Sequence, residues 1–272
     1  KAQEIFENDI VVDSYTDNKG LIANIRSYAV FDYLKAKLQG DKDDDGYAIS
    51  ADVLSATQFG APQKRMRFVI MGIRKDIADV VKLPEGKYKD GPYRTVEDAI
   101  KDLEDVEPVY NVSDDKSGIK LQAKTGLSEL ALTLRDSEIL HNHIITKTTP
   151  TAMARFKALD QGQNFHSLSE EMKTNTYTDV TRTQNTIYLR LKYDEPSGTV
   201  VNVRKSMWVH PTKDRAVSIR EAARLQTFPD SFVFCGTKDK QYQQVGNAVP
   251  PIMAKAIAKK LASQLNKALS QK

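Results

Sequence analysis

The chain has 272 residues, of which 40% are hydrophobic and 28% charged, with a formal net charge of +4. This composition is typical of a globular protein and excludes an intrinsically disordered chain. No apolar run reaches the roughly 18 residues that would predict a membrane-spanning helix. The single cysteine excludes an internal disulfide framework and a cysteine-rich zinc site, so we expect a reducing, cytoplasmic location. The mild basicity permits a nucleic-acid partner but does not require one.

Strands and helices are predicted in the first 105 residues. A short apolar run at 10–12 precedes a helix expected over 25–38. The acidic stretch at 40–46 lacks the spacing of a calcium loop and predicts a solvated turn. Residues 47–54 alternate like a strand, and 67–73 form a β-rich apolar run typical of a buried strand.

A helix is predicted to begin after Thr95, which with Asp98 has the pattern of a capping box. From about residue 106 the chain changes character, because Ser, Thr, Asn and Asp become frequent and helical periodicity is short. We expect a separate, loop-rich, partly β domain there, with strands at 188–191 and 199–203 joined by a turn at 195–198.

Regular structure is predicted to return in the last part of the chain. Ser218 and Glu221 form a capping-box pattern before a helix expected over 221–227. A final helix is expected to start at Pro250, with apolar residues at helical spacing along one face. The predicted domains are therefore 1–105, 106–215 and 216–272.

Three segments, taken in order, resemble a known family. Residues 59–67 read FGAPQKRMR, residues 218–230 read SIREAARLQTFPD, and residues 244–251 read QVGNAVPP. In this order and spacing they resemble the C-terminal half of the cytosine-C5 DNA methyltransferases of bacterial type. The resemblance implies an α/β fold with a partial AdoMet-dependent methyltransferase (Rossmann-like) sheet, into which a loop-rich target-recognition domain is inserted. It also implies methyl transfer from S-adenosyl-L-methionine (AdoMet) to C5 of a flipped cytosine in double-stranded DNA.

The chain departs from the family pattern in its first part. The family's glycine-rich AdoMet motif, its Pro-Cys nucleophile and its Glu-Asn-Val motif are not found, and 7–9 (END) and 17–20 (DNKG) are poor counterparts. We therefore expect this chain to be incomplete and inactive alone, with a complementary N-terminal half or subunit that carries the nucleophile. The alternative is a catalytically inactive DNA-binding or regulatory module of the same fold, and an RNA substrate also remains open.

Catalytic residues are implied by the first segment. By resemblance, Arg67 hydrogen-bonds O2 of the flipped cytosine, and Arg65 holds a neighbouring phosphate or orders the catalytic loop. Both arginines are expected on one side of a strand, because alternate residues share a face. Gln63 is expected to support the local backbone and DNA contacts. On local spacing alone, a pair of surface arginines at the start of a strand is the preferred interpretation, and the functional one rests on the three segments together.

Cofactor and DNA contacts are implied elsewhere. The turn of Asn247, Ala248 and Val249 is expected to complete the AdoMet pocket at a helix start, the alternative being a helix cap without a ligand. Thr199 and Val200 resemble the family's pair beside the target base, where a hydroxyl and a methyl can contact base edges; the alternative is two ordinary strand residues. Further basic residues are candidates for phosphate contacts: Arg182, Arg190, Lys192, Arg204 and Lys205.

Other reactive side chains are given structural roles. Cys235 follows no proline, so a semi-buried apolar cysteine is expected there rather than a nucleophile. The four histidines form no metal pattern with it, and hydrogen bonding is favoured. Arg220, Glu221 and Arg224 are expected to organise the base of the recognition domain rather than to act in catalysis.

Overall fold

The computed structural model describes residues 11–17, 20–25, 30–40, 46–173 and 183–271. It divides into two compact units. Unit 1 comprises residues 1–51, 70–82 and 261–272, and unit 2 comprises 52–69 and 83–260. Most of the acidic turn expected at 40–46 lies outside the described residues, as do 7–9, 18–19 and Arg182. None of the described helices is long and apolar enough to cross a membrane.

The described strands pair two by two as β1 with β2, β3 with β4 and β5 with β6. Their bounds are β1 Val11–Asp17, β2 Gly20–Ile25, β3 Tyr47–Ser55, β4 Met66–Arg74, β5 Ile119–Lys120 and β6 Ile139–Leu140. The described α-helices are α2 Val30–Gln39, α3 Val96–Ile100, α4 Glu129–Leu134, α5 Pro150–Lys157, α6 Glu170–Lys173, α7 Val203–Ser206, α8 Ile219–Leu225, α9 Lys238–Asn247 and α10 Pro251–Leu269. Short 3₁₀ turns lie at Ala56–Phe59, Lys101–Leu103, Val112–Asp115 and Phe165–Ser167.

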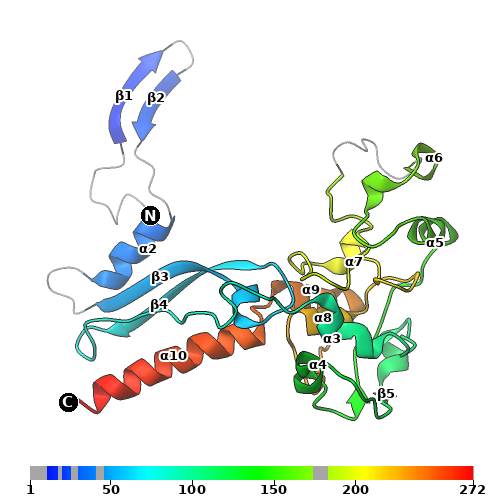
Figure 1. Ribbon diagram of the computed structural model, residues 1–272. Helices are drawn as coiled ribbons and strands as arrows, with labels where there is room; N and C mark the ends of the chain where they lie inside the picture. The colour runs from blue at the N-terminus through cyan, green and yellow to red at the C-terminus, as the bar shows by residue number, and fades with distance from the viewer. Residues whose placement is uncertain (1–10, 18–19, 26–29, 41–45, 174–182, 272) are drawn as a thin grey trace. The chain divides into compact units, whose positions relative to one another are not determined.

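Unit 1 contains the antiparallel β1–β2 hairpin and α2 (Figure 1). The helix expected over 25–38 is observed as α2, and residues 26–29 before it are not described. The strand expected at 10–12 is longer than predicted, because β1 continues to Asp17 and pairs with β2.

The two strands predicted at 47–54 and 67–73 are confirmed as β3 and β4. In unit 2, the start of α10 packs on their near ends, where Met253 joins a cluster with Leu54 and Phe59 (Figure 1). Alternate strand residues point to opposite faces. Val69 packs against that cluster, whereas Phe68 beside it is 48% exposed.

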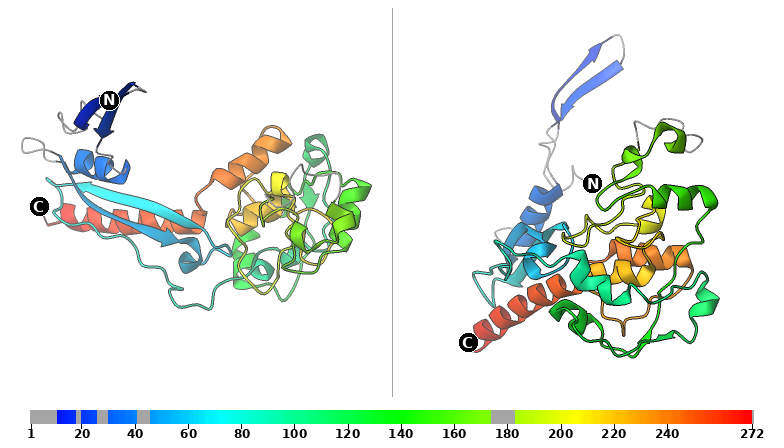
Figure 2. Two further views of the ribbon diagram at one scale, coloured as in Figure 1. Left: turned by 90° about the horizontal axis from the view of Figure 1, so that it is seen from above. Right: turned by 45° about the vertical axis from the view of Figure 1, so that its right-hand side comes forward.

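The main core of unit 2 is built by α3, α8 and α9, which Figure 2 shows grouped together. Both predicted capping boxes are present, because Thr95 and Asp98 exchange hydrogen bonds before α3, and Ser218 and Glu221 do so before α8. Trp208 lies in this core, fully buried. A second cluster gathers around α5, with Phe156 and Phe165 at its centre.

The strands expected at 188–191 and 199–203 are wrong. Arg190 makes only an isolated bridge to Val209, and α7 begins at Val203. At 199–203 the cause is that the backbone bonds to a side chain rather than to a neighbouring strand: the amide of Val200 donates to Gln63. The helix expected over 221–227 is also displaced, since α8 starts directly after its cap at Ser218 and ends at Leu225.

Candidate functional site

Gln63 lies at the centre of unit 2, fully buried. Its Nε2 donates to the backbone oxygen of Leu225 at 3.0 Å and to Oε1 of Gln226 at 2.7 Å. Its Oε1 accepts from the amide of Val200 at 3.1 Å. Gln63 therefore connects the end of α8 with the 199–203 segment. With no exposed surface, it supports the local backbone as expected but presents nothing to DNA.

Arg65 lies beside Gln63 and is 1% exposed. Its Nη1 donates to the backbone oxygen of Val200 at 2.7 Å, and its Nη2 donates to that of Gly246 at 2.9 Å. Burial, together with the nearby charge of Arg67, lowers the pKa of Arg65 to about 10. The expected phosphate contact is not available in this structure, because the guanidinium is enclosed and its outer nitrogens are directed to two backbone carbonyls.

The end of α9 completes this arrangement. Gln226 donates to the backbone oxygen of Val245 at 2.7 Å. Gly246 is buried so closely against the chain that a Cβ there would lie 2.7 Å from the carbonyl carbon and oxygen of Val201. We call Gln63, Arg65 and Gln226, with the backbone they hold at 200, 225, 245 and 246, the junction. It brings together the segments at 59–67, 218–230 and 244–251, and ties them to 199–203.

Thr199 and Val200 differ in exposure. Val200 is fully buried and belongs to the main core, so its side chain cannot reach a base edge as expected. Thr199 is partly exposed, and its hydroxyl donates to the backbone oxygen of Lys64 at 2.8 Å. The exposed apolar residue of this segment is Val201, at 46%. The burial of Val200 leaves Thr199 as the accessible member of the pair that was expected beside the target base, and its contact with DNA stays a prediction.

Arg67 is more exposed to solvent than Arg65. It lies on β4 and is partly exposed, and its Nη1 donates to the backbone oxygen of Met66 at 2.7 Å. Among the described residues that is its one hydrogen bond, so the rest of the guanidinium is available to a ligand. The expected joint action of the two arginines is therefore not seen: one guanidinium holds the junction and the other stays accessible.

Asn247 is the last residue of α9 and is exposed. It therefore lies at a helix end rather than at the helix start that was expected, because α10 begins only at Pro251. The amide of Ala248 donates back to Val245 at 3.3 Å, and Val249 is 46% exposed. An exposed carboxamide followed by an exposed aliphatic side chain fits one edge of a cofactor site, but these residues enclose no cavity by themselves.

A network of buried charges surrounds α8. Arg224 donates to both carboxylate oxygens of Asp230 and to Asp102, and all three side chains are almost fully buried. Burial raises the pKa of Glu221, but its ion pair with Arg215 outweighs burial and holds that pKa well below its usual range. These contacts agree with the structural role expected for the segment.

Arg220, the remaining charge of α8, acts in the same way. It donates to the backbone oxygens of His141, Pro229 and Phe232. Burial lowers its pKa to about 10.

Cys235 and the histidines take no part in a reactive cluster. Cys235 is exposed rather than semi-buried as expected. His143 is fully buried between the hydroxyl of Ser218 and the backbone oxygen of Val106. No group of three or more potential metal ligands occurs among the described residues.

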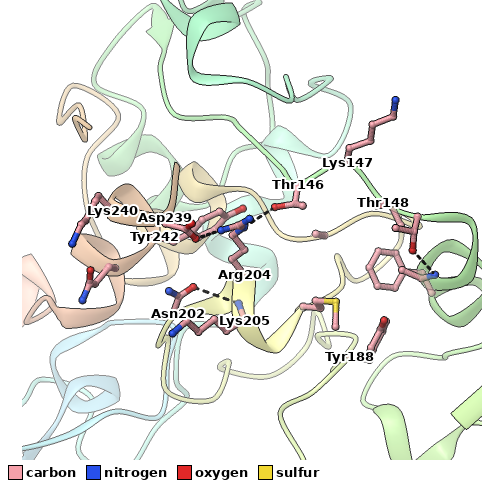
Figure 3. Close-up of a pocket in the computed structure, with 16 residues that line it drawn as sticks. Thr146, Lys147, Thr148, Tyr188, Asn202, Arg204, Lys205, Asp239, Lys240 and Tyr242 are labelled. Carbon is pink, nitrogen blue, oxygen red and sulfur yellow. Dashed lines mark hydrogen bonds and ion pairs between the residues drawn. The ribbon is translucent and has the colours of Figure 1, made fainter. Parts of the chain in front are cut away.

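A cleft of about 680 Å³ lies at another face of unit 2 (Figure 3). Its apolar lining includes Phe156, Tyr188 and Met207. Its cationic side chains are Lys147, Arg204, Lys205 and Lys240, against the single carboxylate of Asp239. Arg204 is ion-paired with Asp239.

Of the four described basic residues that were predicted to contact phosphate, only Lys205 is exposed with a side chain that has no partner among the described residues. Arg190 is 5% exposed and bound to Asp214, and Lys192 pairs with Glu195. Lys147 and Lys240 were not predicted. A signal for Lys147 exists in the sequence, because no acidic residue occurs from 139 to 159.

Comparison with known proteins gives consistent matches. The family described as C-5 cytosine-specific DNA methylase matches residues 26–263. The type II methyltransferase M.DdeI of Desulfomicrobium norvegicum is 28% identical over 244 residues, which cover 85% of this chain and 58% of that protein. The type II methyltransferase M.AquIB of Picosynechococcus is 35% identical over 144 residues, which cover 49% of this chain and 95% of that protein.

A solved structure is also similar. It is the crystal structure of a protein named as a DNA modification methyltransferase encoded within an E. coli prophage. The match has a TM-score of 0.62 and 25% identity, and covers 81% of this chain and 61% of that one. The fold is thus a mixed α/β methyltransferase fold. The chain spans about half the length of the first curated relatives that it matches.

Proposed function

Because the chain belongs to the C-5 cytosine-specific DNA methylase family, we propose that it is the C-terminal, target-recognising part of an enzyme that methylates cytosine at C5 in duplex DNA. The observation that carries the proposal is the junction. Gln63 and Arg65 hold together the three segments by which the chain resembles this family, along with the segment at 199–203.

Methylation at C5 needs a nucleophile that this chain does not supply. C5 of cytosine reacts only after a thiolate adds to C6, and the base must first leave the duplex. Cys235 is exposed, follows Phe234 rather than a proline, and lies apart from Arg67 in the sequence. In our proposal a complementary N-terminal half or subunit supplies the thiolate. M.AquIB supports such a division, because nearly all of that short curated methyltransferase is covered by its match to half of this chain.

The outer face of β3 and β4 is where we place that complementary part. Val53, Met66 and Phe68 are 50%, 55% and 48% exposed, whereas Leu54 is buried on the other face. Exposed apolar side chains on two paired strands of nine residues each favour a protein partner that covers them. In this proposal residues 1–105 continue the catalytic sheet, 106–215 form the inserted recognition domain, and 216–272 return to the core.

Arg67 is the residue that we assign to the reaction itself. Its partly exposed guanidinium keeps donors available, and a guanidinium stays charged while presenting a rigid fork of donors. In the proposal it donates to O2 of the extrahelical cytosine and stabilises the charge that develops on the ring. AdoMet, when bound, supplies the methyl group, and Asn247 with Val249 would form one edge of its site.

The test is reconstitution. The 272-residue chain, with and without a family polypeptide that carries the glycine-rich and Pro-Cys segments, is incubated with duplex DNA and methyl-labelled AdoMet. We expect label on cytosine C5 only with both parts present. Arg67→Gln should abolish label transfer while duplex binding persists, and Arg74→Gln on the same strand should leave both unchanged.

Two outcomes would replace this proposal. Strong methylation by the chain alone would show that no complementary part is needed. DNA binding without methylation by any such mixture would favour the catalytically inactive regulatory module instead.

A further inference from the structure

The cleft in unit 2 has an unbalanced charge. Lys147 precedes α5, Lys205 lies in α7 and Lys240 lies in the first turn of α9, so three separate segments each contribute one lysine to its lining (Figure 3). All three side chains are exposed. Within the part of the chain that the structure describes, none of the three ammonium groups has a hydrogen-bond or ion-pair partner. The only carboxylate of the lining, Asp239, is already paired with Arg204.

The segments that carry these lysines are held in place by contacts of their own. Arg204 also donates to the hydroxyl of Thr146, so it links α7 to the residue before Lys147. Tyr188 and Met207, in the floor of the cleft, adopt left-handed backbone conformations with φ of 54° and 50°. Such conformations are costly outside glycine and persist only where surrounding contacts enforce them. The backbone at the bottom of the cleft, beside the lysines, therefore has a conformation that its surroundings enforce.

The number and origin of the cations suit a polyanion. Three lysines from separate segments line a cleft of about 680 Å³, which favours a ligand that bears several anionic groups over one compact anion. The floor of Phe156, Tyr188 and Met207 offers apolar contact to the sugars and base edges between those groups. Lysine suits this task, because it neutralises phosphate as a point charge without demanding one geometry.

We infer that this cleft binds the phosphate backbone of duplex DNA through Lys147, Lys205 and Lys240. The inference rests on the proposed function and adds to it the surface on which the duplex is held. These contacts position the DNA but carry no sequence information, so they act on all duplexes alike.

The experiment measures binding of the full chain to a labelled 20-base-pair duplex by fluorescence anisotropy over a series of salt concentrations. The variant is K147Q/K205Q/K240Q. The matched control is K116Q/K120Q/K259Q, which removes three lysines that are also exposed and, among the described residues, also without side-chain partners. Circular dichroism of both variants establishes that the fold is kept.

We expect the cleft variant to bind the duplex more weakly and to lose about one unit of the slope of log K against log salt for each lysine removed. The control should keep the affinity and slope of the wild type. The inference is overturned if the cleft variant keeps both, if the two variants lose equally, or if the wild-type chain does not bind duplex DNA at low salt. Equal binding of an RNA duplex through the same lysines would overturn the assignment to DNA.

Failure of this inference and failure of the proposed function can be told apart. If the cleft variant binds DNA normally and the reconstituted enzyme still methylates it, only the cleft assignment is lost. If the cleft variant loses binding but no mixture methylates DNA, the cleft assignment stands and the enzymatic proposal falls.

Discussion

Gly246 packs against Val201 so closely that there is no space for a side chain between them: a Cβ would lie 2.7 Å from the carbonyl carbon and oxygen of Val201. Alanine is ordinarily more favourable than glycine in a helix, by about 1 kcal/mol. Here the effect of alanine should be reversed, because the obstacle is backbone and Arg65 fixes the carbonyls of Gly246 and of Val200 beside it. Because the atoms in the way are the main chain of Val201, we expect Gly246→Ala to lower the free energy of unfolding by roughly 1–3 kcal/mol, as overpacking does, measured by urea denaturation.

Gly198→Ala is the control for that change. A Cβ at Gly198 would meet its nearest neighbour, Trp208, at 3.9 Å, which is ordinary contact. Its free energy of unfolding should stay within about 0.5 kcal/mol of the wild type. Equal effects of the two substitutions would mean that the packing of α9 on Val201 is not as described.

The two carbonyl contacts of Arg65 predict a stability effect at that position. Arg65→Met keeps much of the side-chain length but leaves the backbone oxygens of Val200 and Gly246 without donors. Hydrogen bonds to charged groups contribute about 1.5–3 kcal/mol each, so we expect the loss of both to cost roughly 3–6 kcal/mol in urea denaturation. Arg67→Met, on the accessible arginine, should change stability little. A larger loss of stability for Arg67→Met than for Arg65→Met would contradict the roles given to the two arginines.

The buried pair of Arg224 and Asp230 predicts a further large loss. Asp230→Ala removes one partner and leaves part of the guanidinium buried without its carboxylate. Breaking a buried pair in this way costs about 3–5 kcal/mol, which thermal or urea unfolding would register. As a comparison, Asp76→Ala breaks the exposed contact to Arg74 and should cost less than about 1 kcal/mol. A small loss of stability in Asp230→Ala would mean that the carboxylate of Asp230 is in contact with water.

His210 predicts a dependence of stability on pH. Burial lowers its pKa to about 4, although Glu221 lies 3.7 Å from its Nε2 and opposes that shift. Because the folded pKa lies below the unfolded value of 6.5, the unfolded chain binds the proton more readily between pH 6.5 and 4. Stability is therefore full above pH 6.5 and falls as pH is lowered toward 4, by up to about 1.4 kcal/mol per pH unit.

His210→Asn tests that dependence, since asparagine keeps an acceptor for the amides of Thr212 and Lys213 without titrating. Urea denaturation between pH 6.5 and 5 should give a shallower slope for the variant. Some slope will remain, because burial also lowers the pKa of His143. Identical slopes in variant and wild type would show that His210 does not bind its proton on unfolding.

The parts of the fold that depend on neighbouring residues could be predicted from the sequence. The caps at Thr95 and Ser218 act over three residues, and β3 and β4 follow local patterns of apolar residues. The segment at 199–203 could not be predicted, because the partners of Val200 come from Gln63 and Arg65, more than 130 positions away. Alternation alone cannot distinguish a strand from a segment held in this way.

The candidate site was predicted unevenly for the same reason. Residue patterns identified Gln63 and Arg65 as important, but burial reassigned them from DNA to the protein's own backbone. Arg67 and Asn247 are accessible, in keeping with a ligand contact, and their roles stay predictions. Lys147 and Lys240 were missed. A lysine without an acidic neighbour in the sequence indicates a binding site only when the fold brings it together with other lysines, and here the three come from distant segments.

The contacts of the junction determine which positions of the 199–203 segment can be substituted without loss of the fold. Four of its contacts end on backbone oxygens, those of Val200, Leu225, Val245 and Gly246. Backbone oxygens are the same whatever side chain the residue carries, and the side chains of Thr199 and Val201 lie outside the enclosed part. Libraries randomised at these two positions should therefore yield mostly folded proteins, so that the recognition role proposed for this segment can be tested by selecting for altered sequence preference.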